Sequence, residues 1–97
     1  MTLFEPAVFG ALQLSNRVVM APLTRTRADD DGVPTETMVE YYRQRAGQGL
    51  IISEGTWPAP EGKSYSGQPG IVTPEQIAGW RPVADAVHEA GGTIVMQ

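Results

Sequence analysis

The chain has 97 residues, of which 41% are hydrophobic and 19% are charged, and its formal net charge is -4. These fractions are those of an ordinary globular chain, and the acidic balance without a basic cluster argues against a nucleic-acid surface. Because the chain has no cysteine, a disulfide, a thiolate metal site and an iron–sulfur cluster are excluded within this segment.

Two further patterns bear on location. No apolar run approaches the roughly 20 residues of a membrane span. Residues 1–6 have no basic stretch leading into an apolar one, so we expect no secretory signal. The expectation is therefore a cytoplasmic protein that binds neither membranes nor nucleic acid.

The N-terminal part predicts a hairpin and then a buried strand. Residues 1–15 read as short extended pieces with Gly10 at a turn. Val18 to Ala21 form a wholly apolar run, typical of a strand covered on both faces in a parallel sheet or barrel. Pro22 should end this strand, because proline cannot donate to a sheet ladder. Thr24 then lies just past the strand tip, where parallel α/β folds build their sites.

A polar loop follows. It carries Asp29-Asp30-Asp31, but consecutive carboxylates do not converge on one ion, so we expect a solvated loop and no metal. Arg25 and Arg27 could pair with this acidic loop or reach toward the site, and the structural role is favoured.

Residues 35–46 are predicted to form a helix that ends at Gly47. Either Thr35 caps it, or Thr37 forms a capping box with Glu40. A strand at residues 50–53 follows and leads into Gly55. The buried face of the helix should consist of Met38, Val39, Tyr42 and Ala46.

Residues 57–72 are rich in Pro, Gly and Ser and predict a long loop on the ligand side. A second helix should begin at Thr73 as N-cap and end at Gly91-Gly92, with a kink or restart at Pro82. His88 near its end is expected to be solvated. A third strand is predicted at residues 93–96. The apolar face of the helix should comprise Ile77, Trp80, Ala84 and Val87.

This order of a hairpin and then β, α, β, α, β predicts parallel strands joined by right-handed crossovers. Three such strands could be half of an open sheet or the opening of a (β/α)8 barrel, which usually needs roughly 250 residues. As a three-stranded unit the chain would leave two apolar strand edges unpaired. We therefore expect an incomplete α/β domain.

Three strand tips carry candidate site residues: Thr24, Gly55 with Thr56, and Gln97. A flavin suits them, because its pyrimidine edge alternates acceptors and donors that a Gln amide can answer, and a Gly lets backbone approach a flat ring. Taken singly, a Thr after a strand is more often a turn residue, and a Gly or Gln at a strand end is more often structural.

The sequence resembles the Old Yellow Enzyme family of FMN-dependent ene-reductases from Leu3 to Gln97. Three motifs carry the resemblance in the right order. They are Asn16-Arg17-Val18-Val19-Met20-Ala21-Pro22-Leu23-Thr24-Arg25, then Tyr41-Tyr42-Arg43-Gln44-Arg45-Ala46 with Gly49-Leu50-Ile51-Ile52-Ser53-Glu54-Gly55-Thr56, and then Pro69-Gly70-Ile71 with Thr73-Pro74-Glu75-Gln76-Ile77, Trp80, and Val87-His88 before Gly91-Gly92.

The resemblance implies the N-terminal part of a (β/α)8 TIM barrel, with hairpin 1–15 closing the barrel bottom and FMN at the top. It implies that Thr24 bonds the flavin carbonyl near the reactive nitrogen, that Gly55 approaches the ring and that Gln97 binds the pyrimidine edge. NAD(P)H would reduce FMN, which would then reduce an activated alkene. The residues lining the cofactor would be Ala21, Pro22, Leu23, Thr24, Gly55 and Gln97.

Finer assignments follow from the same resemblance. Thr24 marks a Thr-type branch, since some relatives carry Cys there. Thr26, Trp57 and Tyr65 are candidates for the substrate pocket, although Tyr65 could instead anchor its loop and Trp57 could pack for its own burial. Another flavin barrel, such as a hydroxy-acid oxidase, remains the rival within enzymes, and larger dienoyl reductases share the barrel.

The resemblance also implies what this segment lacks. The proton donor and the carbonyl-binding pair come from later strands, so no catalytic residue is expected here. The partner would be the remaining barrel segment, in the same or a complementary chain. The alternative outside enzymes is a truncated or split fragment that acts only as a structural or assembly half.

Overall fold

A computed structural model describes residues 2–97. The elements alternate as the sequence predicts, after an N-terminal hairpin. In chain order they are β1 (Ala7–Phe9), β2 (Leu12–Leu14), β3 (Val19–Met20), α1 (Glu36–Gln44), β4 (Leu50–Ile52), the 3-10 helix η1 (Pro60–Gly62), α2 (Pro74–Glu89) and β5 (Ile94–Val95).

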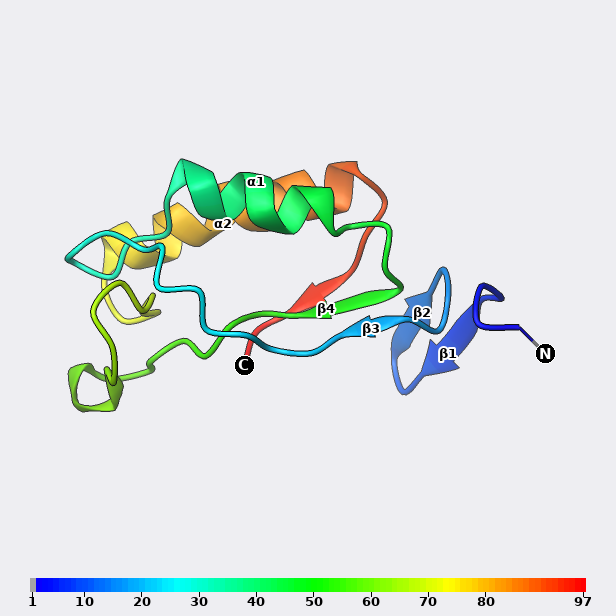
Figure 1. The fold of residues 1–97 in the computed structure, drawn as a ribbon, viewed down its shortest axis with the longest axis horizontal. Helices are drawn as coiled ribbons and strands as arrows, with labels where there is room; N and C mark the ends of the chain where they lie inside the picture. Colours follow the sequence, from blue (N-terminus) through cyan, green and yellow to red (C-terminus); the bar gives the residue numbers. More distant parts are fainter. Residues whose placement is uncertain (1) are drawn as a thin grey trace.

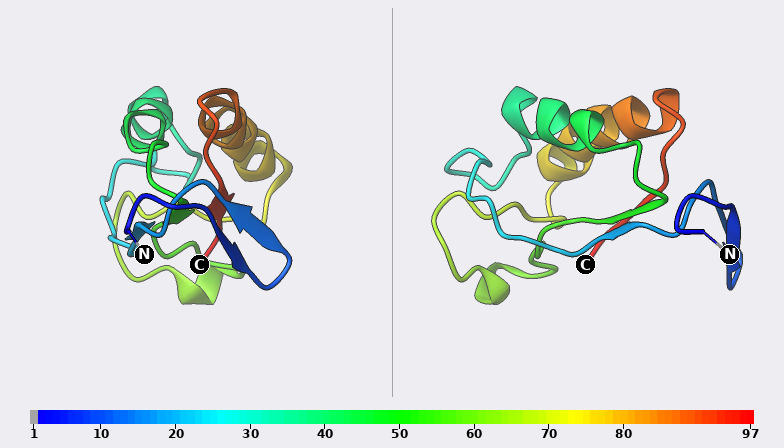
Figure 2. Two further views of the ribbon diagram at one scale, coloured as in Figure 1. Left: turned by 90° about the vertical axis from the view of Figure 1, so that its right-hand side faces the viewer. Right: turned by 45° about the vertical axis from the view of Figure 1, so that its right-hand side comes forward.

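Strands β3, β4 and β5 form one parallel sheet in that spatial order, and β1 and β2 form a separate antiparallel pair. Both helices cover the same face of the parallel sheet and run opposite to its strands (Figure 1). Seen from the end, α1 and α2 lie side by side above the sheet, and among the described residues no α-helix lies on its other face (Figure 2). This is the layering of a wall of a (β/α)8 barrel.

The core lies between the sheet and the helices. Met20 pairs with Ile51, and Ile51 pairs with Ile94, so this row of side chains faces the helices. Val19 is 48% exposed on the open face. Within residues 2–97, the predicted cover on both faces of this strand is therefore found on one face only.

Helix α1 buries the face that its sequence predicts. Met38, Tyr42 and Ala46 are buried and Val39 is half-buried. Thr35 occupies the N-cap position, but its hydroxyl donates to the carbonyl of Arg27 at 2.7 Å instead of capping the helix. The alternative capping box at Thr37 is wrong, because the helix already begins at Glu36.

Helix α2 starts with the predicted capping box: the Thr73 hydroxyl accepts from the Gln76 backbone N–H at 3.1 Å, and the Gln76 side chain accepts from the Thr73 N–H at 3.1 Å. The predicted restart at Pro82 does not occur, since α2 is one helix from Pro74 to Glu89. Pro82 and Ala78, whose carbonyl loses its donor, are both exposed, so water can satisfy that carbonyl.

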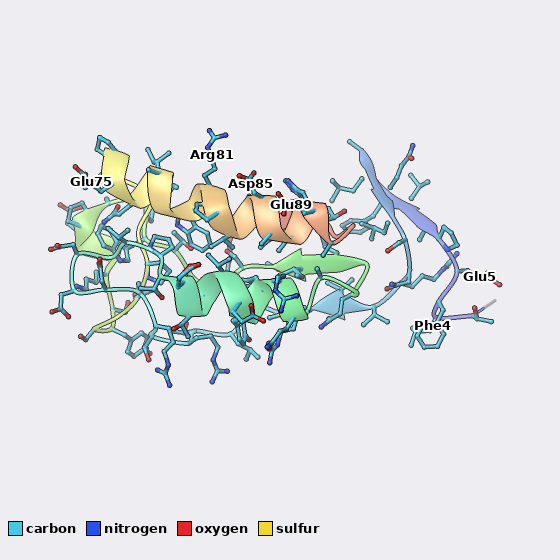
Figure 3. All side chains as sticks on the ribbon, turned by 90° about the horizontal axis from the view of Figure 1, so that it is seen from above. Phe4, Glu5, Glu75, Arg81, Asp85 and Glu89 are labelled. Carbon is cyan, nitrogen blue, oxygen red and sulfur yellow. The ribbon has the colours of Figure 1, made fainter. Side chains whose placement is uncertain are left out.

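The buried face of α2 differs from the prediction. Trp80 and Val87 are buried as expected, but Ile77 is 53% exposed and Val83 is fully buried. Arg81 and Asp85 project from the flank of α2 that faces away from α1 (Figure 3). The helix is therefore rotated so that Gln76, Trp80, Val83 and Val87 face the core.

The hairpin turns at Gly10, whose φ of 61° favours glycine, and pairs Phe9 with Leu12. It lies beyond the N-terminal ends of the parallel strands (Figure 1). In a (β/α)8 barrel this end is the bottom. The role of the hairpin in closing the barrel stays a prediction.

Candidate functional site

The three strand tips meet at one edge of the sheet. Met20 pairs with Ile51, and Ile52 pairs with Val95, all in parallel register. The segments after β3, β4 and β5 therefore leave the sheet on the side away from the hairpin (Figure 1). Ligand sites of parallel α/β folds lie at this carboxyl edge.

Gly55 and Gln97 lie against each other. The Thr56 N–H donates to the Gln97 carbonyl at 3.1 Å, and the Gln97 N–H donates to the Ser53 hydroxyl at 3.2 Å. A Cβ added to Gly55 would be 3.7 Å from Gln97 Oε1. The structure therefore brings these two predicted site residues together.

The tip of β3 reaches the same place through its backbone. Ala21, Leu23 and Thr24 are exposed and Pro22 is half-buried. The Arg25 N–H, directly after Thr24, donates to Glu54 Oε1 at 3.5 Å. Since Glu54 precedes Gly55, this bond connects the two tips one residue away from each candidate contact.

The polar groups at the tips fit a flavin. Within residues 2–97, the Thr24 hydroxyl and the Gln97 side-chain amide make no hydrogen bond, and both residues are exposed. Together they offer donors and an acceptor, which the alternating acceptors and donors of a flavin pyrimidine edge require. Gly55 adds a backbone without a side chain. The roles of all six cofactor-lining residues nevertheless stay predictions.

A buried pair lies beneath the tips. Glu54 is 1% exposed, and its Oε2 accepts from the Tyr42 hydroxyl at 2.8 Å, while the Glu54 N–H donates to the same hydroxyl at 2.9 Å. Burial raises the pKa of Glu54, against the opposing effect of its hydrogen bonds from Tyr42 and Arg25. Burial also raises the pKa of Tyr42, which keeps the phenol protonated.

The loop after β4 is fixed by Gln68, which is 8% exposed. Its amide nitrogen donates to the Gly55 carbonyl at 3.1 Å, and its Oε1 accepts from the Ser64 N–H at 2.9 Å. The Tyr65 side chain is exposed and its backbone N–H donates to the same Oε1 at 3.4 Å. Gln68 therefore connects the loop after β4 to the backbone of Gly55, one of the candidate flavin contacts.

Trp57 packs inside this loop. Its indole N–H donates to the Gln68 carbonyl at 2.9 Å, and its backbone pairs with Gly70. A Cβ on Gly70 would come within 2.7 Å of the indole ring, so glycine lets the ring pack there. These contacts favour the alternative in which Trp57 is a packing residue of its own loop. A place for Trp57 in a substrate pocket stays a prediction.

Thr26 has a φ of 56°, which is unusual for a residue other than glycine. Its hydroxyl donates to the Arg25 carbonyl at 2.7 Å, and a Cβ on Gly67 would lie 2.5 Å from the Thr26 carbonyl oxygen. The two loops therefore touch at Thr26. Its place in the substrate pocket, like that of Tyr65, stays a prediction.

The arginines of the β3–α1 loop do not pair with the acidic residues. Arg27 donates to the carbonyl of Arg25 at 3.0 Å, and the one ion pair within residues 2–97 joins Arg43 to Glu40. Arg25, Arg27 and Arg45 line a cavity of about 420 Å³ together with Glu54. The loop itself turns on Asp29, whose carboxylate accepts from backbone N–H groups at 2.9 Å.

Sequence reasoning missed two buried residues, Glu54 and Gln68, that form hydrogen bonds next to the strand tips. Glu54 could have been noticed, because it directly follows an apolar strand. A carboxyl group that is buried at such a position needs hydrogen-bond partners. Gln68 gave no such signal, since a single amide in an aperiodic loop carries no pattern. His88 is exposed near the end of α2 away from the strand tips, in agreement with its expected solvation.

Neither metal-binding nor membrane-spanning features are present in the described part of the chain. Residues 2–97 contain no cluster of three or more His, Cys, Asp or Glu side chains that could hold a metal ion. No helix in this range is long and apolar enough to cross a membrane.

The fold and the tips define a segment of a parallel α/β barrel with a flavin-compatible carboxyl edge. Residues 2–97 match the NADH:flavin oxidoreductase / NADH oxidase family. The chain belongs to this family. The resemblance to Old Yellow Enzyme is confirmed at this level.

Similar proteins agree. A Leishmania infantum protein described as a probable flavin mononucleotide-dependent alkene reductase is 47% identical over 95 residues, which cover 98% of this chain and 26% of that protein. The Old Yellow Enzyme homologue from Zymomonas mobilis superimposes with a TM-score of 0.96 at 52% identity, covering 100% of this chain and 27% of that one. This chain thus spans about a quarter of the length of the relatives it matches.

Morphinone reductase in complex with tetrahydroNAD superimposes with a TM-score of 0.93 at 52% identity, over 98% of this chain and 26% of that chain. The structural neighbours are Old Yellow Enzyme barrels, so the predicted fold, the N-terminal part of a (β/α)8 barrel, is confirmed. FMN and a nicotinamide reductant are the cofactors of this family.

Proposed function

We propose that this chain supplies one wall of the FMN site of an ene-reductase, in which NAD(P)H drives the reduction of activated C=C bonds such as those of enones and enals. When bound, FMN supplies the hydride chemistry. The observation that carries the proposal is the convergence of Gly55, Gln97 and the β3 tip at one sheet edge.

Each candidate residue has a task at this edge. The Gln97 amide would bind the pyrimidine edge, and the free Thr24 hydroxyl would donate to the ring carbonyl near the reactive nitrogen. Gly55 would bring backbone to the ring face, while Ala21, Pro22 and Leu23 line it. We infer from Thr24 that the protein is of the Thr-type branch, without a thiol at the flavin.

The remaining parts of the proposal concern the whole protein. We infer that the rest of the barrel, in the same or a complementary chain, supplies the carbonyl-binding pair and the proton donor. The substrate pocket would border Thr26, Trp57 and Tyr65. A cytoplasmic location is proposed, with NADPH or NADH as reductant.

A second candidate is a truncated or split fragment that acts only as a structural or assembly half. The open face of the sheet, where Val19 is 48% exposed, favours this for the chain on its own. It differs from the first candidate in requiring neither bound FMN nor turnover.

The deciding experiment measures the intact mass of the native material together with its visible absorbance. A longer chain or a co-purifying partner with a flavin band, and NAD(P)H oxidation on adding an enone, supports the ene-reductase. A mass near 10.4 kDa without a flavin band supports the assembly fragment instead.

A further inference from the structure

Glu54 connects three elements beneath the proposed flavin site. Its Oε2 accepts from the Tyr42 hydroxyl of α1 at 2.8 Å, and its Oε1 accepts from the Arg25 N–H after β3 at 3.5 Å. Its own N–H, after β4, donates back to the Tyr42 hydroxyl at 2.9 Å. One side chain therefore bridges the tips of β3 and β4 to a helix.

The bridge lies one residue from each proposed flavin contact. Arg25 follows Thr24, and Glu54 precedes Gly55. Peptide geometry is stiff, so fixing the Arg25 N–H also restricts the Thr24 carbonyl and its Cα. The Thr24 side chain has no hydrogen bond within residues 2–97 that would hold it from elsewhere.

Burial makes the Glu54–Tyr42 part of the bridge rigid. Glu54 and Tyr42 are 1% and 0% exposed, so water does not compete for the hydrogen bonds between them. Tyr42 is also packed by Tyr41 and Trp80, with ring centroids 5.0 Å and 6.4 Å away. The Glu54 carboxyl group is thus held by the Tyr42 side chain, which is itself fixed by its packing in the core.

We propose that Glu54 is a positioning residue, which sets where the Thr24 hydroxyl meets the flavin by joining the β3 and β4 tips to α1. The inference rests on the proposed function, since it needs FMN at the strand tips. Glu54 does not touch the flavin in this scheme. It acts through the Arg25 amide and through the Gly55 backbone.

The test uses the complete FMN-loaded barrel. The variants are Glu54→Leu, which removes both acceptors, Glu54→Gln, which keeps one, Thr24→Ala, and the double variant of Thr24→Ala with Glu54→Leu. The readouts are the reduction potential of the bound flavin, its visible absorption maximum and the rate constant of its reduction by NADPH or NADH. A merely structural carboxylate would change stability and leave the potential unmoved.

We expect Glu54→Leu to shift the potential in the same direction as Thr24→Ala and to slow flavin reduction by about threefold or more, as expected when one hydrogen bond is weakened. In the Thr24→Ala background it should add no further shift, because the hydroxyl it positions is gone. Glu54→Gln keeps one acceptor, so its flavin potential should differ from that of the wild type by no more than half of the shift seen in Glu54→Leu. An unchanged potential in Glu54→Leu, or additive shifts, overturns the inference.

A second pair of variants covers the case in which Glu54→Leu loses its fold. Tyr42→Phe frees the carboxylate from α1, and Tyr41→Phe removes a neighbouring hydroxyl that makes no hydrogen bond within residues 2–97. We expect a shifted potential for Tyr42→Phe and a wild-type one for Tyr41→Phe. Identical behaviour of the two overturns the inference.

The two proposals fail differently. If the complete barrel holds no FMN, or if Thr24→Ala leaves the potential unchanged, the role proposed for the strand tips is wrong and the inference falls with it. If Thr24→Ala shifts the potential and neither Glu54→Leu nor Tyr42→Phe does, only the inference about Glu54 is wrong.

Discussion

Thr24→Ala tests the proposed flavin contact most directly. The Thr24 side chain is exposed and unbonded within residues 2–97, so its loss should change the free energy of unfolding by no more than about 0.5 kcal/mol. A hydroxyl that donates to the ring carbonyl stabilises the electron-rich reduced flavin. Losing a hydrogen bond of about 0.5–1.5 kcal/mol should lower the flavin potential and slow its reduction roughly two- to tenfold.

The assay follows the loss of oxidised-flavin absorbance after anaerobic mixing of the FMN-loaded complete barrel with NADPH or NADH. Thr2→Ala is the matched control, because Thr2 is also exposed and precedes the hairpin, at the end of the sheet opposite the strand tips. Equal reduction rates for Thr24→Ala and wild type, with FMN fully bound in both, would refute the role of Thr24.

Three further variants address binding and folding of the complete barrel. Gln97→Ala should lower FMN retention, measured as the flavin-to-protein ratio after dialysis, and a fully yellow variant would count against its role. Trp80→Ala should destabilise the fold by about 3–5 kcal/mol, since the indole is 7% exposed and donates to the Gly70 carbonyl at 3.1 Å; exposed Arg81→Ala is the control in thermal unfolding. Thr73→Ala should cost about 1 kcal/mol of stability by removing the capping box, measured by the same unfolding assay.

The sequence predicts the alternation of strands and helices because apolar runs and helix caps are local signals. It fails on the rotation of α2, where Ile77 is exposed and Val83 is buried. Periodicity alone does not choose between these neighbouring faces. The buried face includes Gln76, which is 1% exposed and whose amide donates to the Asp31 carbonyl at 2.8 Å across the fold. A contact between residues 45 positions apart leaves no local pattern.

The same distinction applies to the site. Thr24, Gly55 and Gln97 could be proposed because each follows an apolar strand, a feature visible along the chain. The side chains that form hydrogen bonds to the backbone of these tips leave no comparable local pattern. Glu54 is paired with Tyr42 across two elements, and Gln68 bonds Gly55 from a loop without periodicity. Candidate ligand contacts are therefore more visible in the sequence than the residues that position them.

The isolated 97-residue chain should neither stay monomeric nor hold FMN. Val8 and Phe9 are exposed on the hairpin and Val19 on the open sheet face, and β3 and β5 present unpaired edges within the described residues. Such apolar surfaces and edges promote association. We expect aggregation in size-exclusion chromatography, and a flavin-binding barrel that no longer aggregates once the remaining segment is supplied.

A substitution on the open face tests whether the same surface drives aggregation of the isolated chain and forms the interior of the complete barrel. Val19→Lys should reduce aggregation of the isolated chain, because a charge on an edge strand opposes pairing, and should also block assembly with the remaining segment, because the same position would lie inside the barrel. Arg17→Lys keeps the charge near the start of the same strand and is the control. A monomeric isolated wild-type chain with a cooperative urea transition would contradict the view that this segment is one wall of a larger fold.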